Sequence, residues 1–312
     1  MDFLSLLNTV ITLALVMASG FIGSKFGVID EVSSKKLSLL ILRIGQPFLI
    51  LSSILGVESS KENLVLGFKT LLIGFAIHIF IAIVAFGACM GFKDLNERKL
   101  SEFAIVFGNV GFMGFPVLES LYGEKGLFMG VFIVISFNIL LWSLGILILG
   151  RKRKDMKLTL KKIFLNFGTV PSFIGLIVFI SGIRLPEFVY TTASYLGSLC
   201  TPISLIITGA LLAKKKPAEI FLAPKIYFVS LVRLIIIPLL ICTIAKLIGF
   251  DQDYIMFLTV VTAMPCAAII SMLAELYDIN PGYAAQTVGT SSLLSIATMP
   301  CVLLLAEQIA SI

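Results

Sequence analysis

Apolar residues form long runs along the whole chain, and short polar segments separate these runs. A helix needs about 20 mostly apolar residues to cross the roughly 30 Å of hydrocarbon in a bilayer. Backbone groups in lipid must be satisfied within the segment, so the runs are predicted to be helices, and the alternating pattern of a membrane β-barrel is absent. The ten predicted spans are Leu4–Gly27, Leu37–Gly56, Leu64–Phe92, Ser101–Tyr122, Leu127–Gly150, Phe167–Ile183, Phe188–Ala213, Ile226–Phe250, Ile255–Tyr277 and Tyr283–Ala306.

The composition agrees with an all-α membrane protein. Of the 312 residues, 58% are hydrophobic and only 13% are charged, whereas a soluble domain is typically about a quarter charged. This excludes a soluble enzyme, a nucleic-acid binder and a disordered chain. The five cysteines lie in apolar stretches without metal-ligand spacing, so we interpret them as small buried hydrophobic residues. We expect no cofactor and no metal, and we expect the lipid bilayer, not nucleic acid, to surround the chain.

Lysine and arginine gather in the loops that follow the odd-numbered spans. These loops hold 17 of the 24 basic residues, with three in 25–36, three in 93–99, seven in 151–162 and four in 214–225. The loops on the other side hold four, which are Lys61, Lys125, Arg184 and Lys246. Basic loops tend to stay in the cytoplasm. The bias therefore predicts a multi-pass protein of the plasma membrane with both termini outside.

The longest basic loop divides the predicted spans into two sets of five. We therefore predict a first five-helix unit at residues 1–150, a basic cytoplasmic connection at 151–168 and a second unit at 169–312. An odd number of spans per unit is typical of an inverted repeat. Pro47 and Pro202 are 155 residues apart, and Pro116 and Pro265 are 149 apart, which supports the repeat. A simple helix kink is the alternative explanation for each proline alone.

The fourth predicted span contains residues that interrupt a helix. Glycine and proline both disfavour a helix interior, and broken backbone at membrane depth occurs only where protein or a watery cavity satisfies it. Such a break exposes N–H groups that bind an anion, although glycines also allow close helix packing. Within this span lie Gly108, Asn109, Gly111, Gly114 and Pro116, and the ninth span has a plainer counterpart at Pro265, Cys266 and Ala267.

These motifs resemble the auxin efflux carrier family over essentially the whole chain. The stretch GNVGFMGFPVLESLYGEKG, followed by Asn138, is similar to the fourth and fifth helices of that family. The stretch MPCAAIISMLAELYDINPGYAAQTVGTSSLLSIATMP is similar to its last two helices. The family includes plant auxin exporters and prokaryotic members assigned to malate or malonate permeation. The short connection at the midpoint of this chain resembles the prokaryotic members.

The resemblance implies two inverted five-helix repeats of the bile-acid symporter type. A scaffold part and a transport part would meet beside two crossing, proline-broken helices, and the scaffold part would form a homodimer. The crossover prolines of the family match Pro116 and Pro265, and its fourth-helix asparagine matches Asn109. One departure concerns the second crossover, where many members have a polar residue after the proline. Here the first polar side chain is Ser271, so the second half-site would rely on backbone groups.

Three basic residues lie within the predicted spans. An ionised side chain at the bilayer centre costs from about 3 to over 10 kcal/mol, and snorkelling to the headgroups is the ordinary explanation for Arg43, Lys69 and Arg233. Arg43 is the preferred candidate because Gln46 follows it on the same helical turn. No carboxylate lies near the middle of a predicted span, which favours an anionic substrate over an ion-coupled exchanger built on buried acids.

Uncharged polar residues complete the candidate site. Asn138 in the fifth span and Ser292 in the tenth place hydrogen-bonding groups within the membrane, where they either contact substrate or join helices. The single His78 has no carboxylate partner in the sequence pattern and is interpreted as a packing residue more readily than as a proton relay.

The sequence therefore predicts a secondary transporter, not an enzyme, for a small organic anion such as a carboxylate. Alternating access by a rocking or elevator motion would carry the anion. Two alternatives stay open: a sodium- or proton-coupled organic-anion symporter, and a membrane sensor on the same fold. The proposed substrate-binding residues are Arg43, Gln46, Asn109, Gly111, Gly114, Pro116, Asn138, Pro265, Cys266, Ala267 and Ser292.

Overall fold

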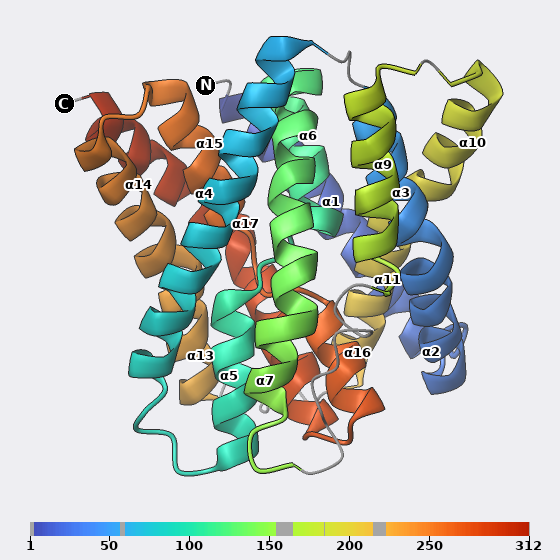
Figure 1. Ribbon diagram of the computed structural model, residues 1–312. Coiled ribbons are helices and arrows are strands. Elements are labelled where there is room, and N and C mark those ends of the chain that lie inside the picture. The colour runs from blue at the N-terminus through green and yellow to red at the C-terminus, as the bar shows by residue number, and fades with distance from the viewer. Residues whose placement is uncertain (1–2, 57–59, 154–164, 184, 215–222, 312) are drawn as a thin grey trace.

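The computed structural model describes residues 3–56, 60–153, 165–183, 185–214 and 223–311. Most of the predicted cytoplasmic connection, residues 154–164, and Arg184 lie outside these ranges. Within the described ranges all regular elements are helical (Figure 1). Six helical segments are long and apolar enough to cross a membrane, namely Glu31–Leu55, Lys61–Ala88, Val110–Leu149, Glu187–Ala213, Pro224–Ile248 and Pro281–Ser311.

The helices follow the predicted apolar runs in chain order. In the first half they are α1 (Phe3–Lys25), α2 (Glu31–Leu40), α3 (Gln46–Leu55), α4 (Lys61–Ala88), α5 (Leu95–Val106), α6 (Phe115–Leu140) and α7 (Ile146–Leu149). In the second half they are α9 (Thr169–Ser181), α10 (Glu187–Ser198), α11 (Cys200–Ala213), α13 (Pro224–Leu231), α14 (Ile237–Ile248), α15 (Gln252–Thr262), α16 (Ile269–Leu276) and α17 (Pro281–Ser311).

Two helices begin more than a full turn before the apolar pattern predicts. α2 and α5 each start six residues before the predicted span, because an aspartate caps each of them. Asp30 accepts a hydrogen bond from the backbone of Ser33, which holds the pKa of Asp30 below its ordinary value, and Asp94 caps α5 in the same way. The prediction that nearby basic residues lie in loops was therefore wrong for Lys35, Lys36, Arg98 and Lys99, which belong to these helices.

The predicted loop between the fourth and fifth spans is a sharp bend. At Gly123 the backbone has φ +59° and ψ −146°, and helical residues of α6 continue on both sides. Glycine reaches this region of φ/ψ space without a steric penalty. The two predicted spans therefore meet at one bent residue, and the polar Glu124 and Lys125 that follow it belong to the helix.

Three of the helix-internal prolines follow a widened, π-helical turn. The turns are η1 (Ile41–Gly45), η2 (Val110–Gly114) and η4 (Val232–Ile236), with Pro47, Pro116 and Pro238 two residues after their ends. A proline lacks an amide hydrogen and clashes with the carbonyl four residues earlier. A π-helical turn relieves that clash, so the expected interruption at Pro47 is a local widening of a continuous helix. A fourth such turn, η3, covers Leu141–Gly145.

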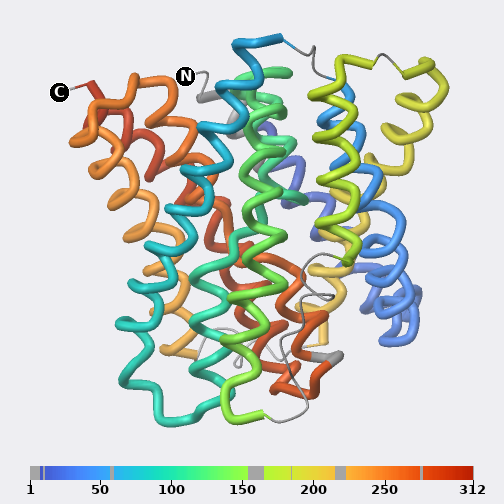
Figure 2. Tube along the Cα trace, viewed as in Figure 1, coloured from blue at the N-terminus to red at the C-terminus, as the bar shows by residue number. Residues whose placement is uncertain are grey.

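The helices form two groups of neighbours (Figures 1 and 2). In one group α1 packs along α11, and α3 packs against α9 and α10. In the other group α4 packs against α6, and α14 packs against α15 and α17. The crossing of α1 and α11 is close, since a Cβ at Gly209 would lie 1.8 Å from the Met17 carbonyl oxygen.

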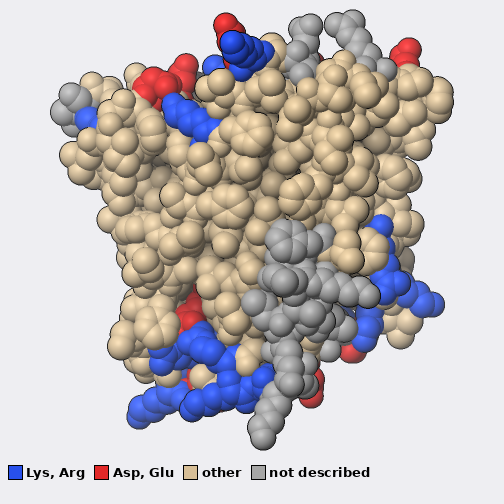
Figure 3. Space-filling model, in the orientation of Figure 1, with Lys and Arg blue, Asp and Glu red and all other residues tan. Residues whose placement is uncertain are grey.

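Charged residues avoid the middle of the outer surface on the visible face. Figure 3 shows a broad band without charged side chains across the visible face, with Lys and Arg concentrated at its lower end. Large apolar side chains are exposed on the outer helices, such as Leu15, Leu72, Ile83, Ile177 and Leu247. An exposed apolar surface of this extent is typical of a face covered by lipid.

Candidate functional site

Two helices break and cross near the middle of the molecule. α5 ends at Val106 and α15 ends at Thr262, and each is followed by a short extended segment. The segments pair in antiparallel fashion at Gly108 and Cys266. The amide of Asn109 donates to the Pro265 carbonyl at 2.8 Å, and the amide of Ala267 donates to the Phe107 carbonyl at 2.9 Å. The two breaks therefore satisfy each other's backbone groups.

A third helix contributes to the crossing through a hydroxyl. Ser291 of α17 is fully buried, and its Oγ accepts a 3.2 Å hydrogen bond from the amide of Cys266. The same Oγ donates to the Val288 carbonyl at 3.0 Å. This contact fixes the ninth predicted span at its break, although the residue of α17 predicted to bind substrate was the neighbouring Ser292.

A buried arginine lies against both breaks. Arg233, in turn η4, is 2% exposed. Its Nε donates to the Met264 carbonyl and its Nη1 to the Ile105 carbonyl, both at 3.0 Å. Gly108 makes room for the guanidinium, since a Cβ there would lie 1.7 Å from Nη2. Among the described residues no carboxylate pairs with Arg233, so a positive charge lies at the crossing.

A small cavity lies beside the crossing. It has a volume of about 30 Å³, enough for about one or two water molecules. Four of the predicted substrate-binding residues line it, from α3, the two breaks and turn η2, namely Gln46, Asn109, Gly111 and Ala267. We call it the central cavity, and its lining includes Gln46, Asn109, Gly111, Phe112, Phe137 and Ala267.

Asn138 lies next to this cavity, and part of its side-chain amide has no hydrogen-bond partner among the described residues. Its Oδ1 accepts a 3.1 Å hydrogen bond from Nε2 of Gln46, which joins α6 to α3. Its Nδ2 is buried and has no hydrogen-bond partner among the described residues. The Gln46–Asn138 pair therefore joins the two groups of helices, and Nδ2 of Asn138 remains available to donate a hydrogen bond.

Two wider cavities flank the central one. The upper cavity, about 310 Å³, is lined by residues that include Ser52, Pro116, Glu119, Glu124 and Tyr190, and it shares Leu49 and Phe115 with the central cavity. The lower cavity, about 230 Å³, is lined by residues that include Ser34, Lys35, Lys214 and Ser271, and it shares Ala268 with the central cavity. The three form a series along the molecule with its narrowest point in the middle.

The structure separates some predicted site residues from this series. Arg43 lies in a groove with Pro47 and Leu51, with its guanidinium 5.9 Å from the Phe167 ring centre, so it does not supply charge to the central cavity. Gly114 packs near Met264 without lining the cavity. Ser292 is buried in α17, and its Oγ has no hydrogen-bond partner among the described residues. His78 bonds the Gly74 carbonyl at 2.7 Å and packs against two phenylalanines.

Sequence reasoning missed the role of Arg233. Its depth in the span matched that of Arg43, so both were assigned to snorkelling, with the preference given to Arg43. Gly108 distinguishes Arg233 from Arg43, because its missing side chain leaves space for the Arg233 guanidinium. This contact exists only in the folded chain. Gly108 and Arg233 are 125 residues apart in the sequence, so no local pattern indicates that they are in contact.

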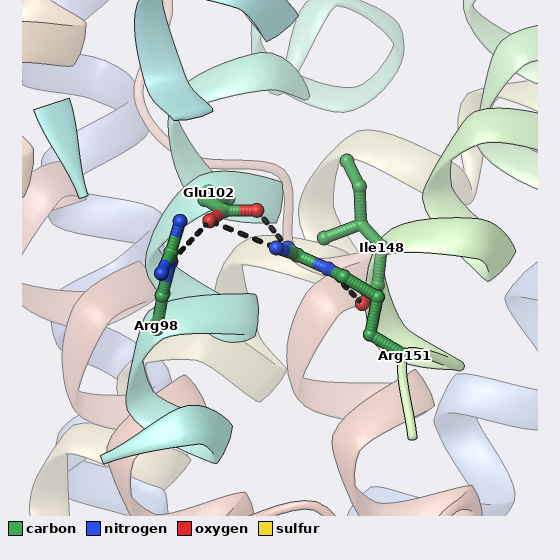
Figure 4. Close-up of polar contacts among 4 residues, drawn as sticks. All are labelled: Arg98, Glu102, Ile148 and Arg151. Carbon is green, nitrogen blue, oxygen red and sulfur yellow. Dashed lines mark hydrogen bonds and ion pairs between the residues drawn. The ribbon is translucent and has the colours of Figure 1, made fainter. Parts of the chain in front are cut away.

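A second cluster lies at the lower end, shown in Figure 4. Glu102 of α5 is 2% exposed and pairs with Arg98 at 2.9 Å and with both Nη atoms of Arg151. Arg151 also donates to the Ile148 carbonyl at 3.3 Å. Desolvation, with repulsion from Arg98, lowers the pKa of the Arg151 guanidinium below its ordinary value. The cluster ties α5 to the end of α7, and Glu102 lies one helical turn before Ile105, whose carbonyl binds Arg233.

Comparison with known proteins covers nearly the whole chain. Residues 5–303 match the family described as "Membrane transport protein". An "Uncharacterized transporter" of Methanocaldococcus jannaschii is 26% identical over 96% of this chain and 99% of its own length. The "Uncharacterized transporter YfdV" of Escherichia coli K12 is 17% identical over 94% and 95%. A "Putative malonate transporter" of Rhizobium meliloti is 23% identical over 74% of each chain.

Proposed function

From the premise that this chain belongs to the membrane transport protein family of the auxin efflux carriers, and is therefore a membrane transporter, we propose that it moves a small organic anion by alternating access. The cargo class is a carboxylate, either a monocarboxylate or a dicarboxylate such as malonate, which the name of one relative mentions. The central cavity is the proposed substrate site.

The observation that carries this proposal is the unpaired positive charge at the paired breaks. Arg233 is held within the crossing by two carbonyl oxygens and faces no carboxylate among the described residues. A buried charge without a counter-ion is costly, and a bound anion next to the crossing lowers that cost. Asn109 and Gln46 line the cavity and supply polar groups that orient a carboxylate.

The proposed architecture has ten spans in two inverted five-helix units. The bend at Gly123 supports counting the long segment Val110–Leu149 as parts of two spans. Both described ends, at α1 and α17, lie at the upper end of the molecule in Figure 1, opposite the Lys-rich end. An even number of spans returns the chain to its starting side, so this placement agrees with external termini and a cytoplasmic lower end.

The proposed motion moves the two helix groups past each other. Gln46 belongs to the group with α3, whereas Asn109 and Asn138 belong to the group with α5 and α6. A central cavity of about 30 Å³ is too small for a dicarboxylate, so the groups must separate slightly before cargo enters. Wider cavities at both ends support access from each side in turn.

The test is uptake of radiolabelled organic acids by reconstituted proteoliposomes, with malonate in the panel. We expect saturable uptake of at least one acid, and we expect Asn109→Ala to reduce it about tenfold or more, as loss of a charge-assisted hydrogen bond predicts. Asn96→Ala is the matched control, because Asn96 is exposed at the start of α5. Saturable binding of an acid without any flux would favour the sensor alternative.

A further inference from the structure

The lower cavity has features that the transport proposal does not use. It lies between α2, α11, α16 and α17 at the Lys-rich end, and it is several times larger than the central cavity. Only Ala268 is shared between their linings. The lower cavity is therefore a separate space, adjacent to the proposed substrate site.

Two buried hydroxyl groups line this cavity without partners. Ser34 on α2 is 5% exposed and Ser271 on α16 is 8% exposed. Neither Oγ has a hydrogen-bond partner among the described residues. Buried polar groups in folded proteins are nearly always satisfied. The pair, on two different helices that line one cavity, therefore indicates a ligand that accepts hydrogen bonds.

The charged residues that line this cavity favour a ligand with negative charge. Lys35 and Lys214 line it, against one carboxylate, Glu31. The Ile270 and Ser271 amides at the start of α16 already donate to the Ala267 and Ala268 carbonyls, so side chains must recognise the ligand. Hydroxyl donors and an excess of ammonium groups together recognise a small carboxylate or sulfonate anion.

We propose that the lower cavity is a second anion-binding site, at which a small carboxylate binds before it passes Ala268 into the central cavity. The inference rests on the proposed function for the direction of passage, but anion binding at Ser34 and Ser271 stands without it. The site is distinct because Asn109 and Gln46 do not line it.

A cysteine reporter tests the charge of the site. Ala285 lines the cavity, half-buried on α17, and Ala285→Cys leaves both serines in place. The background carries Cys301→Ser, since Cys301 is the exposed cysteine and the other four are buried. We compare two thiosulfonate reagents, one with an anionic sulfonate group and one with a cationic ammonium group, and divide each rate by the rate with a free thiol in solution. We expect the anionic reagent to react about fivefold faster. The double variant Lys35→Gln, Lys214→Gln should remove this preference. A preference for the cationic reagent overturns the proposal.

Malonate protection separates the two sites. We expect malonate to slow modification of the Ala285→Cys protein, and to do so equally well when Asn109→Ala is added. If Asn109→Ala abolishes protection, the lower cavity is only an access path, and the second site is disproved while the central site stands. If malonate neither protects nor is transported but the sulfonate preference persists, malonate is not the cargo and the lower anion site stands.

Serine variants identify the donors. We expect Ser34→Ala combined with Ser271→Ala to abolish malonate protection without lowering the thermal midpoint of the ligand-free protein, because each lost hydroxyl was unpartnered. Ser38→Ala is the matched control, since Ser38 lines the same cavity but its hydroxyl already donates to the Ser34 carbonyl at 2.8 Å. Protection that survives in the double variant overturns the assignment of these hydroxyls.

Discussion

At the scale of single residues, Arg233 decides how the crossing is held together. Its guanidinium joins a carbonyl at the end of α5 to one in the break after α15, so one side chain bridges the two halves of the chain. Arginine suits this position because its fork of donors reaches two acceptors at once. Gly108 is its counterpart, since any side chain there would occupy the place of the guanidinium.

We predict that Arg233→Met abolishes anion binding and lowers stability. Removing the donor leaves two buried carbonyl groups unsatisfied, at about 1–3 kcal/mol each. Arg233→Lys keeps the charge but not the fork, so it should retain part of the binding. Thermal unfolding in detergent and radioligand binding measure the two effects. Arg43→Met is the matched control, because Arg43 lies in a separate groove beside Phe167, whereas Arg233 binds the carbonyls of the two breaks.

A steric variant tests the same contact while Arg233 is present. Gly108→Ala should displace the guanidinium and lower the thermal midpoint, whereas Gly111→Ala should not, because a Cβ at Gly111 meets no atom within 4 Å. Equal midpoints for the two alanine variants would contradict the role given to Arg233.

At the scale of helices, the apolar pattern was a good guide to position and a poor guide to ends. Each predicted run falls on helical residues, because hydrocarbon thickness sets helix length. The glycines and prolines of the fourth and ninth runs likewise marked the breaks. The starts of α2 and α5 depend on capping by Asp30 and Asp94, and those local polar contacts lie outside the apolar run. No local pattern could predict that Glu102 pairs with Arg151, 49 residues later.

We predict that Glu102→Gln loosens α5 from α7. Loss of the carboxylate charge leaves Arg98 and Arg151 near each other without a counter-ion, at a cost of about 1–3 kcal/mol because both arginines are partly exposed and can rehydrate. Thermal unfolding should show a lower midpoint, with little change for Glu119→Gln, an exposed glutamate. Unchanged stability of Glu102→Gln would mean that the cluster contributes nothing to holding these helices.

At the scale of the whole molecule, the three cavities and the end charges give the proposed pathway a direction. Glu119 and Glu124 line the upper cavity, whereas Lys35 and Lys214 line the lower one. An anion is therefore attracted at the lower end and repelled at the upper end. The resemblance to the family predicted the crossing, but this asymmetry depends on which side chains the folded helices bring to each cavity.

We predict that transport of the anion is electrogenic and independent of sodium. Each net charge that crosses the membrane is driven by about 2.3 kcal/mol per 100 mV. In proteoliposomes, an inside-positive potassium diffusion potential should accelerate uptake of the labelled acid, and collapsing the potential should slow it. Uptake that requires a sodium gradient and ignores the potential would instead identify the sodium-coupled symporter.

The paired breaks have a consequence for how such a protein can evolve. The bonds from Asn109 to Pro265 and from Ala267 to Phe107 join main-chain atoms only. Main-chain pairing does not depend on the identity of the side chains, so substitutions at positions 109 and 267 can reshape the lining and leave the frame intact. Cargo preference can thus diverge by few mutational steps.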